Sequence, residues 1–382
     1  MENVRVEELA LQRKRYAHLT DEEFRFMLQQ VEGRQRTRDK LPSFAEIEDW
    51  WYPVRLSCEQ CSSEITARYK AGLTTKSGEY SRLVDLTGGY GVDMYFMSEY
   101  VAEAHYIERN EELCRIAKHN FELTRPYVVV HNSSAEEFLA EYKDLEDTLI
   151  YLDPARRDTH GGKVFRIEDC VPNVITLLPI LKQAKKVVIK LSPMLDITAA
   201  LRSLDMSFDV HIVAVKNEVK EVLLVQAEGE GKIYATNILD DQTQQVFCFL
   251  ADEEKLSECL IYHKEWSHLI DKEAYIYEPN AAIIKSGAYK LIGERYGLCK
   301  MGVSTHLYLS KDYVADFPGR VWEIVETNIK EAKGINANVM TRNYPITADQ
   351  LRKKLKVKDS DTHTIIGARL GDRPTLFLCK RV

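Results

Sequence analysis

The stretch that decides the fold is residues 83–93, Leu-Val-Asp-Leu-Thr-Gly-Gly-Tyr-Gly-Val-Asp. An apolar strand ends in Asp85 and Thr87, and a turn containing Gly88, Gly89 and Gly91 then leads into an amphipathic helix. Glycine has no Cβ and tolerates positive φ, so a ligand can approach the backbone of such a turn closely. The turn would lie at the carboxyl end of a strand, where open α/β sheets bind their ligands. Taken alone the pattern is weak, because an ordinary strand-to-helix loop can also be rich in glycine.

Further strand-like segments follow the turn in order, and helical segments rich in Ala, Glu, Leu and Lys separate them. The strands expected next are residues 105–108, 128–132 and 149–152, and the last of these continues as Asp153-Pro154-Ala155-Arg156-Arg157. A fifth strand is expected at 185–192, and two more at 208–215 and 222–227. Strands that alternate with helices indicate βαβ units and a parallel sheet. The short polar turn 216–220 predicts that the last two strands are antiparallel.

This series of motifs resembles the class I S-adenosylmethionine-dependent methyltransferases, and it is nearest to RNA methyltransferases with Asp-Pro in the fourth motif. The resemblance covers roughly residues 78–228, and the whole chain resembles bacterial methyltransferases with a ferredoxin-like domain and a C-terminal THUMP-like domain. It implies an α/β fold with a Rossmann-like, seven-stranded sheet that includes an antiparallel seventh strand. We therefore expect a helical N-terminal region at 1–76 and an S-adenosylmethionine-binding domain at 77–229. A small ferredoxin-like α+β domain at 230–318 and a basic THUMP-like domain at 319–382 would follow.

The resemblance implies that S-adenosylmethionine is the cofactor and that the turn with Thr87, Gly88, Gly89 and Gly91 passes its methionine and ribose portion. Asp85 and Asp93 would take its amino group. Glu108 lies at the end of the second strand, where a carboxylate can accept both ribose hydroxyls, although it could also be a surface acid. Ser134 stands where the family has an acid that binds the adenine amine. It is equally a natural N-cap for a helix at 135–142.

Asp153 and Pro154 are the expected catalytic pair. A carboxylate at a strand end can hold an exocyclic amine and accept its developing positive charge. Amine-methylating relatives continue with Pro-Pro-aromatic, whose ring stacks on a flipped base, whereas this chain continues with Ala155. We expect Arg156 in the catalytic site and Arg157 as a substrate contact, because a guanidinium plane can stack on a base or clamp a phosphate.

The methylated atom is inferred by elimination. Asp-Pro-x-Arg is similar to the uridine carbon-5 methyltransferases, which need a cysteine nucleophile after the fifth strand, but the corresponding turn here is Lys190-Leu191-Ser192-Pro193. The sequence therefore favours direct, non-covalent methylation of a base nitrogen in tRNA or rRNA. Lys190 is either a cation near the substrate phosphate or a strand-end lysine in solvent.

The segments that flank this core carry capping signals. Thr20 precedes Asp21, Glu22 and Glu23 and predicts a helix start, and Thr347-Ala-Asp-Gln350 matches a capping box. A helix is expected at 59–71, either as one wall of the cofactor site or as a plain packing helix. Strands are expected at 364–370 and 375–379, and a hairpin at 232–238 and 245–250.

Composition narrows the class of protein. The 382 residues carry a net charge of −7, but residues 342–382 hold ten Lys and Arg against four Asp and Glu. That segment is therefore +6 and the rest of the chain −13, an asymmetry expected when one module contacts phosphates. Of the eight cysteines only Cys58 and Cys61 have CxxC spacing, so buried thiols are favoured over a metal or redox site and no metal is expected. No segment reads as a membrane span or signal peptide, which predicts a cytoplasmic protein.

Three functions remain open at this point. The first is an RNA methyltransferase, with RNA as its partner. The second is a methyltransferase for a protein or small molecule, which the acidic body favours. The third is a catalytically silent binding protein, which the missing aromatic after Pro154 and the missing acid near Ser134 favour. The sequence does not fix the oligomeric state.

Overall fold

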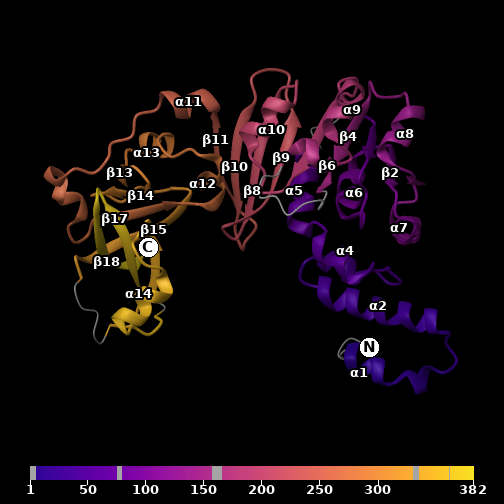
Figure 1. The fold of residues 1–382 in the computed structure, drawn as a ribbon, viewed down its shortest axis with the longest axis horizontal. Coiled ribbons are helices and arrows are strands. Elements are labelled where there is room, and N and C mark those ends of the chain that lie inside the picture. The colour runs from indigo at the N-terminus through magenta and orange to yellow at the C-terminus, as the bar shows by residue number, and fades with distance from the viewer. Residues whose placement is uncertain (1–5, 75–79, 157–165, 330–334, 361) are drawn as a thin grey trace. The chain divides into compact units, whose positions relative to one another are not determined.

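The computed structural model describes residues 6–74, 80–156, 166–329, 335–360 and 362–382. The chain divides into two compact units, of which unit 1 comprises residues 1–208 and 220–229 and unit 2 comprises 209–219 and 230–382. Figure 1 traces both units along the chain and labels their elements. Within the described residues, no helix is long and apolar enough to cross a membrane.

Unit 1 is built on a mostly parallel sheet. Its strand order is β9-β7-β4-β1-β2-β3. These strands are β1 (Arg82–Asp85), β2 (Glu103–Glu108), β3 (Val128–Asn132), β4 (Thr148–Leu152), β7 (Lys186–Leu191) and β9 (Glu218–Gln226). The ladders between β3, β2, β1, β4 and β7 are parallel, whereas β9 runs antiparallel to β7. The predicted α/β class and the antiparallel last strand are therefore confirmed.

Helices connect these strands, as βαβ units require. They are α6 (Val92–Met97), α7 (Glu111–Thr124), α8 (Ala135–Glu141), α9 (Val174–Leu181) and α10 (Ile197–Ser203), with 3₁₀ turns η2 (Ser98–Tyr100) and η3 (Ile167–Asp169). All five residues of β4 are buried, as expected for a central strand with both faces covered. A small antiparallel ladder joins β5 (Ala155–Arg156) to β6 (Cys170–Val171).

The N-terminal region is helical, as predicted. It contains α1 (Val6–Leu11), η1 (Arg13–Tyr16), α2 (Asp21–Thr37), α3 (Pro42–Glu46), α4 (Arg55–Gln60) and α5 (Glu64–Thr74). Thr20 and Glu23 form the capping box of α2. The single helix expected at 59–71 is wrong, because α4 ends at Gln60 and Cys61 is extended. The Lys40 ammonium donates to the carbonyls of Cys58 and Glu59 at the end of α4, which stabilises this break.

Unit 2 begins with strands β8 (Phe208–Val215), β10 (Lys232–Ile238) and β11 (Gln244–Leu250). β10 pairs in parallel with β8 and antiparallel with β11, so the predicted hairpin is present. The resemblance implies that β8 belongs to the sheet of the methyltransferase core. Six of the seven strands lie in unit 1, and β8 is grouped with unit 2, where it pairs with β10.

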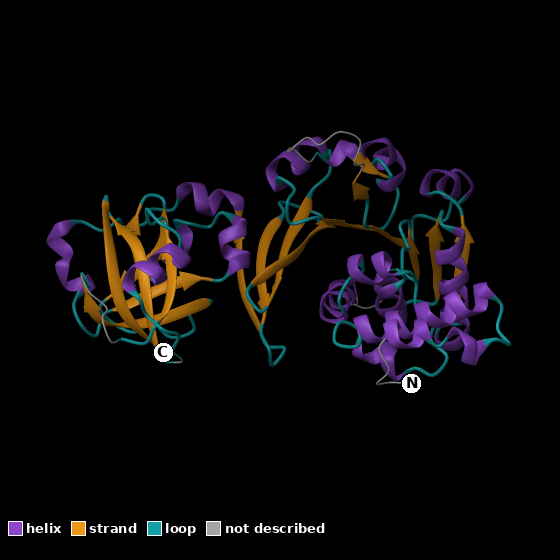
Figure 2. Ribbon diagram, turned by 60° about the horizontal axis from the view of Figure 1, so that its bottom comes forward, coloured by secondary structure: helices purple, strands orange, loops and turns teal. Residues whose placement is uncertain are grey.

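A second sheet fills the rest of unit 2, in the order β13-β14-β12-β15-β18-β17-β16, and Figure 2 shows its strands as a twisted layer with short helices beside it. Its strands are β12 (Tyr275–Pro279), β13 (Cys299–Gly302), β14 (Thr305–Ser310), β15 (Gly319–Thr327), β16 (Asn338–Arg342), β17 (His363–Leu370) and β18 (Arg373–Arg381). The helices are α11 (Ala251–Leu256), η4 (Lys264–Ile270), α12 (Ala281–Ser286), α13 (Leu291–Arg295) and α14 (Ala348–Leu355). β12 pairs with β15, so the expected boundary between 318 and 319 falls between adjacent strands of one sheet.

A buried carboxylate ties this sheet together. Glu278 on β12 is 5% exposed and accepts hydrogen bonds from Arg320 on β15 and Arg342 on β16. Both arginines are partly exposed, so water solvates part of each guanidinium group. The Glu278 carboxylate is buried and depends on the two arginines for its hydrogen bonds. A buried carboxylate without such partners is costly.

Replacing Glu278 with Gln is therefore expected to lower the free energy of unfolding of unit 2 by about 2 kcal/mol, because two charged hydrogen bonds are weakened at a buried site. Hydrogen exchange of the β12, β15 and β16 amides would measure the loss. Glu326→Gln, at an exposed position of β15, is the matched control and should change protection little. Equal protection in Glu278→Gln and the control would contradict the structural role of this carboxylate.

Candidate functional site

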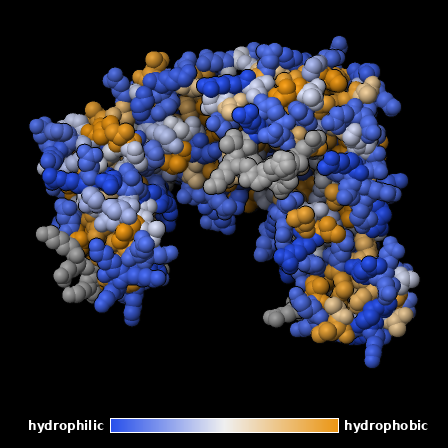
Figure 3. Space-filling view, viewed as in Figure 1, coloured by the Kyte–Doolittle hydropathy of each residue, from blue (hydrophilic) through white to orange (hydrophobic). Residues whose placement is uncertain are grey.

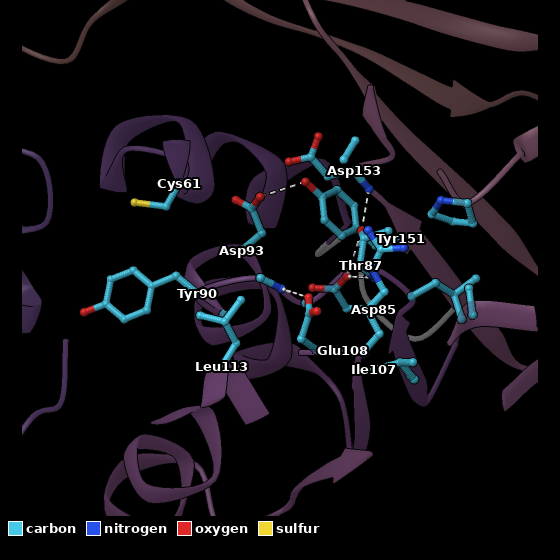
Figure 4. Close-up of a pocket in the computed structure, with 18 of the residues that line it drawn as sticks. Cys61, Asp85, Thr87, Tyr90, Asp93, Ile107, Glu108, Leu113, Tyr151 and Asp153 are labelled. Carbon is cyan, nitrogen blue, oxygen red and sulfur yellow. Dashed lines mark hydrogen bonds between the residues drawn. The ribbon is translucent and has the colours of Figure 1, made fainter. Parts of the chain in front are cut away.

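A cavity of about 330 Å³ opens at the carboxyl ends of β1, β2 and β4. Residues of the glycine turn, the strand ends and the segment between α4 and α5 line it together. Figure 4 shows Asp93, Tyr151 and Asp153 toward one end and Glu108, Ile107 and Leu113 toward the other. The lining includes Cys61, Ser62, Asp85, Thr87, Gly88, Gly89, Gly91, Asp93, Glu108, Ser134, Tyr151 and Asp153. The expectation that the segment before β1 forms one wall of this site agrees with the presence of Cys61 and Ser62.

The glycine turn packs tightly against β2. A Cβ on Gly88 would lie 2.2 Å from the ring of Tyr106, a distance no side chain could tolerate. Gly91 has φ +84° and begins α6, which requires the conformational freedom of glycine. The Tyr106 hydroxyl donates to the carbonyl of Gly89. Packing therefore fixes the backbone of the turn in a shape that leaves its other side open to the cavity.

Glu108 ends β2 beside this turn. Its Oε2 accepts the Gly89 amide at 3.0 Å and its Oε1 accepts the Asn110 amide at 2.8 Å. A carboxylate oxygen can accept more than one hydrogen bond. The two amides therefore hold Glu108 in place while it can still accept from a diol in the cavity.

Thr87 links the ends of β1 and β4. Its amide and hydroxyl donate to Asp85 Oδ1 at 2.9 and 3.3 Å, and its Oγ1 accepts the Asp153 amide at 2.6 Å. Asp85 is 1% exposed. Burial raises the pKa of its carboxyl to about 8, with Asp93 and Asp153 adding to the rise while the Thr87 hydrogen bonds oppose it. Without a positive ligand, Asp85 is therefore largely protonated at neutral pH.

Asp93 lies in a buried polar cluster with residues of α5 and β4. Its Oδ2 accepts from Ser62 Oγ at 2.8 Å and from the Tyr151 hydroxyl at 2.7 Å. Burial alone would raise its pKa, but Lys70 and Lys190 outweigh that effect and hold the pKa below its ordinary value. Asp93 is consequently a carboxylate, in contrast to Asp85.

Lys70 on α5 is fully buried and anchors this cluster. Its ammonium contacts both carboxylate oxygens of Glu221 on β9, at 2.6 and 2.7 Å, and lies 3.3 Å from Asp93 Oδ1 and from Ser62 Oγ. The sequence reasoning missed Glu221 and Tyr151. Their only signal was a polar group within otherwise apolar strands, which singles out no partner.

Lys190 on β7 reaches Asp153. Its Nζ lies 2.6 Å from Asp153 Oδ2 and 3.2 Å from Ser62 Oγ. Burial lowers the pKa of this ammonium, but the carboxylates of Asp153, Asp93 and Glu221 outweigh burial and hold the pKa well above its ordinary value. Lys190 is therefore a permanent cation beside Asp153. Of the two readings open from the sequence, a strand-end lysine in solvent is thus wrong.

The other predicted site residues are placed less centrally. Ser134 lines the cavity, and its hydroxyl forms the capping box of α8 with Glu137. The structural reading of Ser134 is thus correct, while a contact to adenine stays a prediction. Pro154 is buried, and the backbone of Arg156 pairs with Cys170 in the small ladder. Arg157 lies outside the described residues, as does the side chain of Arg156, so their contacts with substrate also stay predictions.

Cys58 is buried and Cys61 half-buried, and burial raises the pKa of both thiols. Such thiols are poor nucleophiles and poor metal ligands at neutral pH. Across the described residues, no cluster of three or more His, Cys, Asp or Glu could hold a metal ion.

One solved structure is similar to this protein over almost the whole chain. A crystal structure of a protein from Porphyromonas gingivalis W83, provisionally named a methyltransferase, is 32% identical in sequence. The match covers 95% of this chain and 92% of that one, with a TM-score of 0.85. The chain belongs to this family of class I methyltransferases. The predicted family is therefore confirmed.

Further matches agree with this family. Family models of a ferredoxin-like domain and of a THUMP-like domain match residues 275–318 and 319–381. Two uncharacterised S-adenosylmethionine-dependent methyltransferases, from two strains of Mycobacterium tuberculosis, are 24% identical over 250 residues. That match covers 61% of this chain and 64% of each relative.

The residues of the cavity fit S-adenosylmethionine. Asp93 Oδ1 is buried and lies 3.3 Å from the Lys70 ammonium, but among the described residues it accepts no hydrogen bond. Together with Asp85 it could receive an ammonium group, while Glu108 could receive the ribose diol and the glycine turn the chain between them. When bound, the cofactor supplies a methyl group already activated on a sulfonium. The protein then has only to position the acceptor and manage its proton.

The raised pKa of Asp85 gives a pH dependence with a definite sign. Between about pH 4 and pH 8 the folded protein holds a proton on Asp85 that the unfolded chain has lost, so this group's contribution to stability falls as pH rises through that window. Asp85→Asn removes the cost of ionisation. It is expected to raise the free energy of unfolding at pH 9 by on the order of 6 kcal/mol, with little change near pH 4.

The same variant should lose binding of S-adenosylmethionine, because a neutral amide cannot pair with its ammonium. Thermal denaturation at both pH values and isothermal calorimetry would measure the two effects. Asp144→Asn, at an exposed carboxylate, serves as the control and should show neither. Full cofactor affinity in Asp85→Asn would contradict its assignment to the site.

Proposed function

We propose that this protein is an S-adenosylmethionine-dependent RNA methyltransferase that transfers the methyl group directly, without a covalent intermediate on the protein. The observation that carries the proposal is the position of Asp153. Its carboxylate lines the same cavity as the glycine turn and Glu108, so an acceptor held by Asp153 would meet the methyl donor. Direct transfer is favoured because β7 ends in Leu191, at the position where carbon-5 methyltransferases need a cysteine.

The basic face of unit 2 supports RNA as the substrate. α14 buries Leu351 and packs Leu355 against the core, whereas Lys353, Lys354 and Lys356 are exposed. Figure 3 shows mostly hydrophilic side chains at the lower left, where Figure 1 labels α14. The match of residues 319–381 to a THUMP-like domain points in the same direction. An RNA substrate would fit the cytoplasmic location that the sequence predicts.

A protein or small molecule as the acceptor is the second candidate, because the chain outside residues 342–382 is acidic. A silent binding protein is less consistent with a charged pair, Asp153 and Lys190, held 2.6 Å apart at the cavity. The base nitrogen favoured by the sequence as the methylated atom rested on elimination alone.

The direct test is transfer of tritium from labelled S-adenosylmethionine into total RNA from cells that lack this gene. Counts sensitive to ribonuclease are expected with the native protein. Asp153→Ala should lower them at least 100-fold, because the acceptor group of the RNA would no longer contact the Asp153 carboxylate. Cofactor binding by the variant must be intact for this comparison. Ribonuclease-resistant counts would instead indicate a protein or small-molecule acceptor.

The charge of α14 makes a separate prediction about binding. Lys353→Glu combined with Lys354→Glu should weaken RNA binding, and the slope of log affinity against log salt should fall by about 1.5 to 2 because two phosphate contacts are lost. Filter binding over a salt series measures this slope. Lys118→Glu with Lys143→Glu makes the same charge change at exposed sites of unit 1. An equal effect of both double variants would show non-specific attraction rather than an RNA-binding face.

A further inference from the structure

A fixed positive charge, the ammonium of Lys190, lies beside Asp153 of the cavity lining. Lys190 Nζ is bonded to Asp153 Oδ2 and to Ser62 Oγ. An ammonium has three N–H donors, and within the described part of the chain these two are the hydrogen-bond partners of Lys190. One donor is left for a group bound beside Asp153.

Asp153 likewise has one carboxylate oxygen with a hydrogen-bond partner and one without, among the described residues. Lys190 occupies Oδ2, whereas Oδ1 accepts no hydrogen bond from the described residues, and the side chain is 39% exposed. Lys70 cannot play the same part, because Glu221, Asp93 and Ser62 surround its ammonium. Asp153 lines the cavity, and Lys190, whose side chain is 13% exposed, lies directly beside it. The pair thus presents one donor and one acceptor side by side.

This pair suits an oxygen acceptor better than an amine. An amine nitrogen gains positive charge as it takes a methyl group, so a neighbouring ammonium at a poorly hydrated site opposes the transfer. A hydroxyl is a weak nucleophile until it loses its proton. A cation that donates to its oxygen favours the oxyanion, while a carboxylate can remove the proton.

We propose that the acceptor is the 2′-hydroxyl of a ribose in RNA, with Asp153 as its proton acceptor and Lys190 as the cation that stabilises its oxygen. The inference rests on the RNA methyltransferase proposed above and replaces the base nitrogen favoured by the sequence. The 2′-hydroxyl is the group that distinguishes RNA from DNA, and it combines a donor and an acceptor on one atom, as the Lys190–Asp153 pair requires.

The step balances without any further reagent. The O–H bond breaks and its proton passes to Asp153, the O–CH₃ bond forms, and the carbon–sulfur bond of the donor breaks with its electron pair left on sulfur. The positive charge of the sulfonium and the negative charge of the carboxylate disappear together. Because the Asp153 side chain is partly exposed, water can then remove the proton.

The position of the label in the product tests the acceptor atom. Alkali cleaves RNA only where a free 2′-hydroxyl can attack the phosphate, so a 2′-O-methylated nucleotide survives as a dinucleotide. RNA labelled by the full-length protein should yield its tritium in alkali-resistant dinucleotides. Tritium in ordinary mononucleotides would place the methyl group on a base and overturn this inference while leaving the RNA methyltransferase standing. Absence of ribonuclease-sensitive label would overturn both.

Substitution of Lys190 gives a second test, because the two acceptors predict opposite signs. Lys190→Met should lower the rate of transfer about 100-fold or more if the ammonium stabilises an oxyanion, and Lys190→Arg should retain part of the rate. With an amine acceptor, Lys190→Met would keep or raise the rate. Lys182→Met, at a lysine that also pairs with an aspartate at 2.6 Å but on the surface, is the matched control.

Two measurements other than catalysis complete the test. Calorimetric binding of S-adenosylmethionine by Lys190→Met should stay within about threefold of the native value, which shows that the protein is folded and its donor site intact. Once the methylated nucleotide is mapped, the native protein should bind an RNA oligonucleotide about tenfold more tightly than the same oligonucleotide with a single 2′-deoxy substitution at that position. Lys190→Met should not distinguish the two. Discrimination that persists in Lys190→Met would overturn the assigned contact.

Discussion

The site depends on one buried lysine. Lys70 is without solvent exposure, and an ammonium in that position would destabilise the fold by several kcal/mol if it were unpaired. Glu221 on β9, together with Asp93 at the start of α6, supplies the compensating charge. The ion pairs therefore fix α5 against the sheet, and because Ser62 lies just before α5, they also fix the wall of the cavity that Ser62 and Cys61 provide. The N-terminal helices are in this sense part of the site.

Of the two aspartates in the glycine-turn motif, Asp85 is protonated and Asp93 is ionised, and their surroundings explain the difference. Asp93 lies near two ammonium groups, whereas the charged groups that act on Asp85 are the carboxylates of Asp93 and Asp153. Among the described residues, Thr87 alone donates hydrogen bonds to the Asp85 carboxyl. A neutral Asp85 spares the cavity a further negative charge. A positive ligand would reverse that preference, so binding of such a ligand is linked to release of a proton. A substitution that relieves this cost stabilises the fold and removes function.

Local signals in the sequence predicted the elements well. The capping boxes at Thr20 and Thr347 start helices as expected, and the strands of the βαβ series lie within a few residues of their predicted ranges, because apolar periodicity and polar strand ends are local properties. The glycine turn and Asp153 meet at one cavity for the topological reason that parallel strands end at the same edge of a sheet. The break between α4 and α5 was missed because contacts from Lys40 stabilise it, and not a proline or glycine. The Lys70–Glu221 pair joins residues 151 positions apart, and no pattern along the chain encodes such a contact.

The sequence favours a base nitrogen as the acceptor, whereas the structure favours a ribose hydroxyl. The contact between Lys190 and Asp153, which the sequence does not reveal, makes this difference. From the sequence, Asp153 is a free carboxylate at a strand end, and a free carboxylate suits an exocyclic amine. In the folded chain the ammonium of Lys190 bonds to that carboxylate, so an acceptor encounters a cation and an anion together. The resemblance implies Pro-Pro-aromatic for an amine acceptor, and the departure from that pattern at Ala155 then has a consistent explanation. A site that selects a ribose hydroxyl needs no ring to stack on a flipped base, but it does need a cation for the oxygen, and β7 supplies one.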